Sequence, residues 1–181
     1  NYSSGKMGLA LDEALASKGC EVTLVVGPTH LTCNHPNIRR IDVESAVEMY
    51  NAAIEAFPGC DAAILSAAVA DYRPATRADE KIKKQGDAGM CIDLVQNPDI
   101  LASLGAMKSS RQLLVGFALE THDEEQNAKS KLTRKNLDFI VLNSLRDKGA
   151  GFGTDTNKVT IIDKNGHTET STLKSKREIA D

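Results

Sequence analysis

The sequence contains no tryptophan, and aromatic residues make up only 4% of its 181 residues. Proteins that bind single-stranded nucleic acid stack the bases on aromatic side chains, so this composition argues against such a function. Lysine and arginine number 22 against 25 aspartates and glutamates, which gives a formal net charge of −3. This balance argues against a broad surface for a nucleic-acid backbone, although it leaves room for a local basic pocket that binds one small phosphate ligand.

Cysteine is also scarce. The four cysteines lie far apart in the chain and form neither a C-x-x-C pair nor a cluster with histidine. We therefore expect no disulfide framework and no structural zinc site, and we assign no residue to a metal. Unpaired cysteines of this kind are typical of a reducing cytoplasm, which is the location that we expect for this protein.

Long hydrophobic runs are absent as well. The longest nearly apolar run, residues 62–70, is interrupted by Ser66 and is far shorter than the ~20 residues that a membrane helix needs. The start of the chain does not resemble a signal peptide. We expect no membrane partner. Because the chain opens at Asn1 rather than at a methionine, we expect it to be a piece of a longer protein.

The sequence does contain a regular alternation of helix and strand patterns. Its length suits a single domain, which we take to span residues 1–181. Buried-strand patterns alternate with segments whose apolar residues recur at helical spacing, which predicts a Rossmann-like, doubly wound α/β fold with a mostly parallel sheet and helices on both faces. Strands are predicted at residues 22–26, 38–43, 62–67, 91–95, 113–117, 139–142 and 159–162, and helices at residues 4–18, 47–57, 98–107 and 121–136.

The two ends of the chain depart from this alternation. The tight-turn pair Asn165-Gly166 follows the last predicted strand, so we expect a C-terminal β-hairpin. At the other end, the first helix follows a loop of small residues that no strand precedes. Because the first strand of a doubly wound sheet is central, we expect that strand to lie upstream of residue 1.

The loop before the first helix is a candidate phosphate site. Ser3, Ser4 and Gly5 stand at the start of this helix, with Lys6 beside them. The free N–H groups and the dipole of a helix favour a phosphate at its N-terminus, and glycine lets the backbone come close. An ordinary helix cap made of serine and glycine explains the same residues equally well. The phosphate-binding sequences GxxxxGK[ST] and GxGxxG are both absent.

Two further candidates follow predicted strands, where ligands bind to open parallel sheets. Asp71 ends the segment of small residues 66–72, and its carboxylate suits a ribose, a metal-bound phosphate or a turn, of which the turn is the commonest role. Lys81 lies in a basic run, residues 81–84. A lysine stabilises charge that develops on a phosphoryl oxygen, although most such runs are simply solvated surface.

Helix-associated residues give weaker signals. The sequence Asn97-Pro98-Asp99 precedes a predicted helix and is either a cap or a source of N–H groups for a ligand. Lys131 and Lys135 are four residues apart and share one face of a helix. Exposed helices carry many such lysines, so this spacing alone does not identify a site.

Six segments together resemble the phosphopantothenoylcysteine synthetase family, the ligase half of the bacterial bifunctional coenzyme A flavoprotein. They occur in the order and spacing of the family and cover essentially the whole chain. These segments are Asn1-Tyr-Ser-Ser-Gly-Lys-Met-Gly8, Ala67-Ala-Val-Ala-Asp-Tyr-Arg-Pro74, Lys81-Ile-Lys-Lys84, Asn97-Pro-Asp-Ile100, Gly116-Phe-Ala-Leu-Glu-Thr121 and residues 131–136.

The resemblance implies a ligase that joins 4′-phosphopantothenate to L-cysteine. The carboxylate of the pantothenate would attack the α-phosphate of CTP, which releases pyrophosphate and leaves an acyl-cytidylate, and the cysteine amine would then displace CMP. The resemblance also implies Mg²⁺ or another divalent cation, a homodimer for which the hairpin at Asn165-Gly166 is a pairing surface, and fusion to a phosphopantothenoylcysteine decarboxylase domain. We expect no flavin on these residues.

By position, the resemblance also implies site residues. Asn1 and Lys81 would be catalytic, Asn1 and Ala68 would contact the acyl group, and Ser3, Ser4 and Gly5 would form the phosphate loop. The implied nucleotide contacts are Leu65, Ser66, Ala67, Asp71, Lys81, Pro98, Asp99, Ile100, Leu101, Phe117, Lys131 and Lys135.

Without the family resemblance, the residue patterns leave two alternative functions open. An NAD(P)-dependent oxidoreductase uses the same kind of sheet, but it requires a glycine-rich fingerprint that the sequence lacks. A non-catalytic module that binds nucleotide is the other. It would tolerate substitution of Asn1 and Lys81, whereas a ligase would not.

Overall fold

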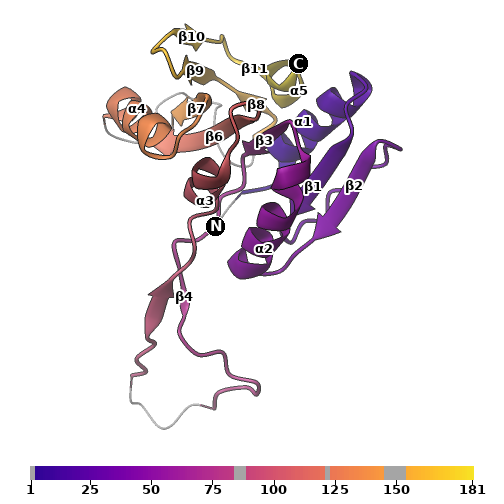
Figure 1. Ribbon diagram of the computed structural model, residues 1–181. Helices are drawn as coiled ribbons and strands as arrows, with labels where there is room; N and C mark the ends of the chain where they lie inside the picture. The colour runs from indigo at the N-terminus through magenta and orange to yellow at the C-terminus, as the bar shows by residue number, and fades with distance from the viewer. Residues whose placement is uncertain (1–2, 84–88, 121–122, 145–153) are drawn as a thin grey trace.

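A five-stranded sheet lies at the centre of the computed structural model, which describes residues 3–83, 89–120, 123–144 and 154–181 (Figure 1). The strand order is β10-β9-β7-β6-β3. Strands β3, β6 and β7 are parallel, whereas β9 is antiparallel to both β7 and β10. These strands are β3 (Ala62–Leu65), β6 (Leu113–Glu120), β7 (Phe139–Ser144), β9 (Val159–Asp163) and β10 (Thr168–Thr170).

A separate pair of parallel strands, β1 (Val22–Val26) and β2 (Ile38–Asp42), lies beside this sheet. Among the described residues, β1 pairs only with β2 and β3 pairs only with β6. Each of these two strands therefore has one edge without a ladder partner in the described part of the chain.

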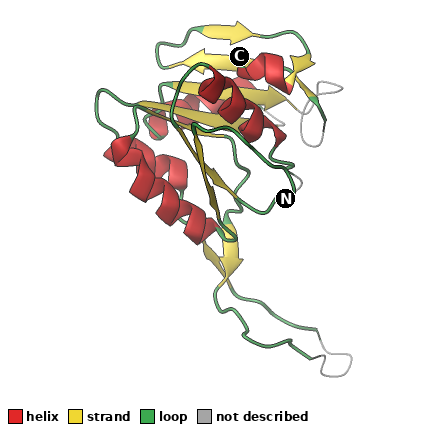
Figure 2. Ribbon diagram, turned by 90° about the vertical axis from the view of Figure 1, so that its right-hand side faces the viewer, coloured by secondary structure: helices red, strands yellow, loops and turns green. Residues whose placement is uncertain are grey.

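Helices pack on both sides of the strands (Figure 2). α3 and α4 contact β6, and α4 also contacts β7; α2 packs on β1 and α3. On the other side, α1 contacts β1 and the C-terminal helix α5. The bounds are α1 (Lys6–Ser17), α2 (Ala46–Ala56), the 3₁₀ turn η1 (Phe57–Gly59), α3 (Ile100–Met107), α4 (Glu124–Arg134) and α5 (Lys176–Ala180).

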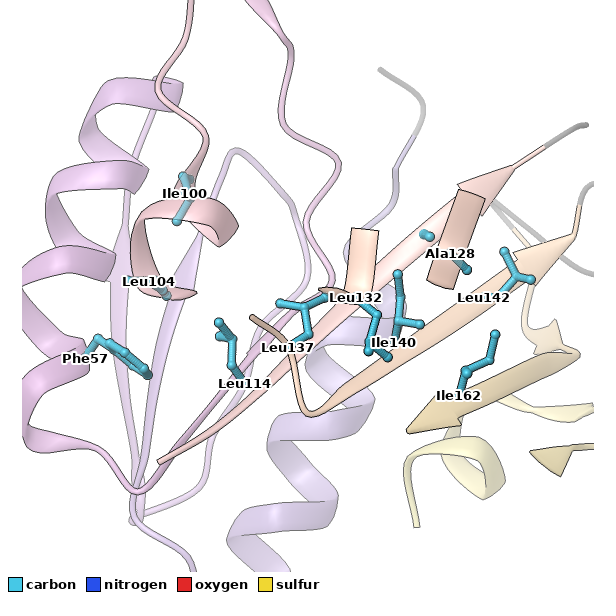
Figure 3. Packing of buried hydrophobic residues seen from close by; sticks show 11 residues of the cluster. Phe57, Ile100, Leu104, Leu114, Ala128, Leu132, Leu137, Ile140, Leu142 and Ile162 are labelled. Atoms are coloured by element: carbon cyan, nitrogen blue, oxygen red, sulfur yellow. The ribbon is translucent and has the colours of Figure 1, made fainter. Parts of the chain in front are cut away.

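The hydrophobic core lies between the sheet and the helices α3 and α4 (Figure 3). Leu114 and Ala118 of β6, and Ile140 and Leu142 of β7, are buried in it. These residues alternate along their strands, so they share the face that α3 and α4 cover. Burying a leucine or isoleucine contributes about 1.5–3 kcal/mol, so this face is a main source of stability.

Helix α3 approaches the end of α4 unusually closely. A Cβ atom added to Gly105 would lie 1.9 Å from the backbone oxygen of Lys135. Asn136, in the left-handed region at φ 52°, donates from Nδ2 to the Gly105 oxygen at 2.9 Å. Only glycine at position 105 permits this backbone contact.

A buried carboxylate joins the amino ends of the strands. Asp138 accepts hydrogen bonds from Lys108 Nζ at 2.7 Å, from Lys164 Nζ at 3.0 Å and from the Leu114 N–H at 2.9 Å. Burial alone would raise the pKa of Asp138, but these three donors outweigh it and lower that pKa to about 2. The carboxylate therefore stays charged and links α3, β6 and the turn after β9.

A long arm, whose described residues are 75–83 and 89–93, extends away from the rest of the molecule (Figure 1). At its base, β4 (Tyr72–Pro74) pairs antiparallel with β5 (Leu94–Gln96). Asn97 fixes this base, because its Nδ2 donates to the Ala70 oxygen and its N–H donates to the Asp71 oxygen, both at 2.8 Å. Along and beside the arm, exposed apolar side chains include Ile82, Met90, Ile92 and Leu94.

The α/β class and the parallel strands agree with the prediction, and three details differ. The strand predicted at 91–95 begins at Leu94 and pairs in the arm rather than in the central sheet, because an apolar pattern does not specify its partner. The helix predicted from 121 has Asp123 as its N-cap, and Thr121 itself lies outside the described residues. At the C-terminal end only a hairpin was predicted, whereas the chain after β10 also forms β11 (Lys174–Ser175), which pairs with β8 (Thr156–Asn157), and then α5.

We predict that Gly105→Ala destabilises the fold by about 3 kcal/mol, because the added methyl group forces α3 away from the end of α4. Urea unfolding of the purified protein measures this loss. Gly59→Ala is the matched control, because a Cβ at Gly59 meets no atom within 4 Å. Equal midpoints for the two variants would contradict the prediction.

Candidate functional site

A pocket lies at the carboxyl ends of β3, β6 and β7, beside the first turn of α1. Its cavity volume is about 40 Å³, and it opens to solvent. Its position matches the edge at which parallel sheets bind ligands. The residues that line it are Ser3, Ser4, Gly5, Lys6, Met7, Ser66, Phe117, Leu119, Asn143, Asn157 and Lys176.

The N-terminus of α1 forms one wall. Gly5 is the N-cap at φ 77°, a conformation that glycine adopts without strain, and no side chain caps the helix. The first turn holds no acidic residue. Thr29, in the loop after β1, supports this segment by donating from Oγ1 to the Ser4 oxygen at 3.4 Å. The first residues of α1, Lys6 and Met7, line the pocket together with the N-cap Gly5. The geometry suits an anion, because the dipole of a helix and its first N–H groups attract negative charge.

The strand ends form the opposite wall. Phe117 and Leu119 lie on the face of β6 that the core does not occupy, since Leu114 and Ala118 point to the core. Asn143 extends from β7, and its Oδ1 accepts from Asn157 Nδ2 at 2.9 Å. Ser66 follows β3. The wall thus combines an aromatic ring with hydroxyl and amide groups.

Two lysines bring positive charge to the pocket. Lys6 Nζ lies 2.6 Å from Asp155 Oδ1, and this contact lowers the pKa of Asp155. Lys176 is only 8% exposed, and its Nζ donates to the Thr154 oxygen at 2.6 Å. Burial, followed by the charge of Lys6, lowers the pKa of Lys176, while Asp155 opposes that change.

Five of the residues predicted from the sequence meet in this pocket: Ser3, Ser4, Gly5, Ser66 and Phe117. Leu65 ends β3 immediately before Ser66 and packs against the core.

Other predicted residues lie along the chain that leads from β3 to the arm. Ala67 is exposed and Ala68 is half-buried. Asp71 is exposed at the base of the arm, where its backbone oxygen accepts from Asn97.

A second group of predicted residues lies around the start of α3 and on α4. Asp99 caps α3 by accepting from the Ala102 N–H at 3.0 Å, and it forms an ion pair with Lys135 at 2.7 Å. Burial would raise the pKa of Asp99, but the bonds from Lys135 and Ala102 lower it. Both side chains therefore already have structural partners. The group comprises Pro98, Asp99, Ile100, Leu101, Lys131 and Lys135.

The two apolar members of this group belong to the core. Ile100 is buried in the cluster (Figure 3). Leu101 packs against the same cluster. They lie on the α3 side of β6, whereas Phe117 faces the pocket. A ligand in the pocket would therefore meet this group only by crossing the end of β6.

Only one of the two predicted catalytic residues lies in the described part of the chain. Lys81 is exposed on the arm, and Asn1 lies outside the described residues. In the described part of the chain, no group of three or more histidine, cysteine, aspartate or glutamate side chains is arranged to hold a metal ion.

The sequence analysis assigned no role to Asn143, Asn157 or Lys176. The chain after residue 166 was interpreted as part of a hairpin. A signal was nonetheless present, because Ser175 and Glu178 have capping-box spacing and form that box at the start of α5. This helix start carries Lys176 into the pocket.

Comparison with known proteins identifies the family. The family described as the DNA/pantothenate metabolism flavoprotein C-terminal domain matches residues 1–181. The chain belongs to this family. A relative from an unidentified prokaryote, named cysteine/cysteine sulfinic acid decarboxylase, is 58% identical over 99% of this chain and 50% of its own length. The coenzyme A biosynthesis bifunctional protein CoaBC of Vibrio cholerae is 48% identical over 92% of this chain and 42% of its own length.

Solved structures share this fold. The crystal structure of the C-terminal domain of a CoaBC protein aligns with a TM-score of 0.81 at 40% identity and covers 99% of this chain and 79% of its own. A Cab2 mutant in complex with phosphopantothenate-cysteine aligns with a TM-score of 0.75 at 16% identity, a level that shows the fold alone. The chain spans about half the length of the curated relatives that it matches.

The hydropathy of the helices adds one further finding. No helix in the described ranges has the length and apolar character that crossing a bilayer requires.

We predict that Asp99→Ala destabilises the protein by about 1 kcal/mol through loss of the α3 cap, whereas Asp99→Asn, which retains a capping acceptor, loses less. Urea unfolding compares the two, with the exposed Asp79→Ala on the arm as control. An equal loss in both Asp99 variants would show instead that the ion pair with Lys135 outweighs the cap.

Proposed function

We propose that this domain is a ligase of coenzyme A biosynthesis that joins 4′-phosphopantothenate to L-cysteine, with CTP as the activating nucleotide. The observation that carries the proposal is the pocket, which gathers a free helix N-terminus, Ser66 and Phe117 in a chain 48% identical to a coenzyme A biosynthesis protein. The Cab2 structure with phosphopantothenate-cysteine supports the product. An oxidoreductase is not favoured, because the chain lacks the glycine-rich fingerprint.

The proposed reaction has two steps. A carboxylate oxygen of phosphopantothenate attacks the α-phosphorus of CTP, the bond from that phosphorus to the bridging oxygen breaks, and pyrophosphate leaves with the electron pair. The cysteine amine then attacks the acyl carbon, loses a proton and displaces CMP. Both steps develop negative charge, which the N-terminus of α1 and nearby lysines are suited to stabilise.

A divalent cation would add positive charge to the polyphosphate. The described residues provide no cluster of metal-binding side chains, so we propose that the phosphate oxygens hold most of such a cation, as is usual for Mg²⁺. The remaining roles fall to the chain: Phe117 would pack against the nucleoside, Ser66 would donate to the nucleotide, and Asn1 would contact the acyl group.

We also propose that a strand from upstream of residue 1 lies between β1 and β3. These two strands each have an edge that is not paired within the described residues, and the loop Ser3–Gly5 would follow such a strand directly. The strand would complete the doubly wound sheet. Because the chain spans less than half of a bifunctional relative, we further propose that a decarboxylase domain is fused to it.

The arm supports a homodimer. Lys81 is exposed on the arm, and the neighbouring Ile82, Met90 and Ile92 expose more than half of their surface in the described chain. An arm of this kind gains stability by packing on a second copy, since exposed apolar patches mark interaction sites. We therefore propose the arm, rather than the hairpin at Asn165-Gly166, as the pairing surface. In that dimer, Lys81 would reach the pocket of the partner.

We predict that Asn1→Asp spares pyrophosphate release but blocks amide formation, because the substitution removes an N–H donor for the developing oxyanion. In the full-length protein, radiolabelled CTP with phosphopantothenate would release pyrophosphate at a normal rate, and a chase with cysteine would yield little product. Unimpaired product formation would refute this role for Asn1, and absence of pyrophosphate release from the unmodified protein would refute the ligase itself.

We predict that Lys81→Gln abolishes turnover and that mixing it with a pocket variant restores activity. Ser66→Phe fills the pocket of its own chain but leaves its arm intact. In a mixed dimer, the pocket of the Lys81→Gln chain would receive an intact arm, so about a quarter of the original activity should return.

Lys83→Gln on the same exposed arm is the control and should remain active. If the mixture stays as inactive as the separate variants while each is dimeric, then Lys81 does not act on the partner's pocket.

A further inference from the structure

Lys176 is a charged residue in a place where charge is costly. It is 8% exposed, and of the three buried polar or charged residues in the described chain, two, Asn157 and Lys176, line the pocket. Burying such groups lowers stability unless they have partners, and here Lys176 donates to the Thr154 oxygen and Asn157 donates to Asn143 Oδ1. These bonds hold both side chains in fixed positions at the pocket. The third, Asp138, lies at the other end of the strands and has three donors of its own.

The local structure fixes the position of Lys176 precisely. The preceding residue, Ser175, pairs with Thr156 between β11 and β8, and the Lys176 N–H donates to the Asp155 oxygen at 2.9 Å. The capping box of Ser175 and Glu178 then starts α5. The backbone of Lys176 is therefore anchored twice, and its side chain lines the pocket while Nζ donates to the Thr154 oxygen.

A second positive charge lies next to it. Lys6 also lines the pocket, and after burial its charge is the second cause that lowers the pKa of Lys176. Asp155 accepts from Lys6 and compensates part of this charge, but the Asp155 side chain is 86% exposed. The lining therefore carries two ammonium groups, and its other polar residues are Ser3, Ser4, Ser66, Asn143 and Asn157.

We propose that Lys176 is a binding residue for the pyrophosphoryl end of the nucleotide, and that it holds the pyrophosphate that leaves in the first step. The assignment rests on the proposed function for the identity of the nucleotide. A polyphosphate carries several negative charges and needs more than one cation, which the pair Lys6 and Lys176 provides. A bound polyphosphate would replace the repulsion between these lysines with attraction to both.

The place of this group in the reaction follows from its charge. When the bond between the α-phosphorus and the bridging oxygen breaks, the electron pair goes to the pyrophosphate, whose charge grows. An ammonium group that contacts this end stabilises the leaving group more than the ground state, which accelerates acyl-cytidylate formation. Lys81 would act at the other end of the site, on the arm, so the two lysines have separate roles.

Inorganic pyrophosphate is the direct probe of this assignment. Isothermal titration of the full-length protein would measure pyrophosphate, CMP and phosphopantothenate separately. We expect Lys176→Met to weaken pyrophosphate binding at least tenfold and to leave CMP and phosphopantothenate binding within twofold, since the charge-assisted bonds of Lys176 go only to the polyphosphate. Lys176→Arg should restore most of the pyrophosphate affinity.

Lys174→Met is the matched control, because Lys174 lies two residues earlier and is exposed. It should bind all three probes as the unmodified protein does. Thermal unfolding of each variant identifies one that fails to fold, and for such a variant Lys176→Arg supplies the comparison by itself: an arginine variant that binds pyrophosphate as tightly as the unmodified protein supports the role.

Three outcomes would overturn the proposal. These are an unchanged pyrophosphate affinity in Lys176→Met, a loss in Lys176→Met that is confined to phosphopantothenate, and a folded Lys176→Arg that binds pyrophosphate no better than Lys176→Met. Failure of the ligase is distinguishable: a protein that binds pyrophosphate through Lys176 but forms no amide retains this assignment and loses the proposed reaction.

Discussion

The position of α1 over the carboxyl ends of the strands is the constraint on which the pocket depends. Thr29 holds the Ser4 backbone, Asp155 holds Lys6, and Lys18 Nζ donates to the Asp181 oxygen at 2.8 Å at the far end of the helix. The helix is thus attached at both ends, on one side to the loop after β1 and on the other to the C-terminal segment around α5. A shift of its first turn would remove the backbone wall of the pocket and separate the two lysines.

This arrangement assembles one small pocket from distant parts of the chain. Ser66, Phe117 and Asn143 come from three neighbouring parallel strands, which bring their ends together by sheet geometry alone. Lys176 is positioned differently, because it directly follows the short strand β11, which pairs with β8. The shape of the pocket therefore depends both on the central sheet and on the position of the C-terminal segment. That segment contributes little to the main core.

The sequence predicts these two contributions unequally. The strand 22–26 and the helices around α1 and α2 follow from local apolar periodicity, and the phosphate loop follows from small residues at a helix start. Lys176 was missed because its burial depends on the two-residue strands β8 and β11, which are too short to leave a pattern. The arm was missed for a similar reason, since its exposed apolar residues resemble those of a buried strand. Ile100 shows a further difficulty: residue type alone does not separate a side chain that packs in the core from one that meets a ligand.

The buried Asp138 stabilises the end of the strands that lies opposite the pocket. Its three donors tie together the amino ends of the strands, where no ligand is expected, and they do so with a group that remains ionised far below neutral pH. Lys108 and Lys164 flank this carboxylate, so its charge is balanced inside the protein and is not presented to solvent. The junction of α3, β6 and β9 therefore keeps its ion pairs at an acidity that already protonates ordinary carboxylates.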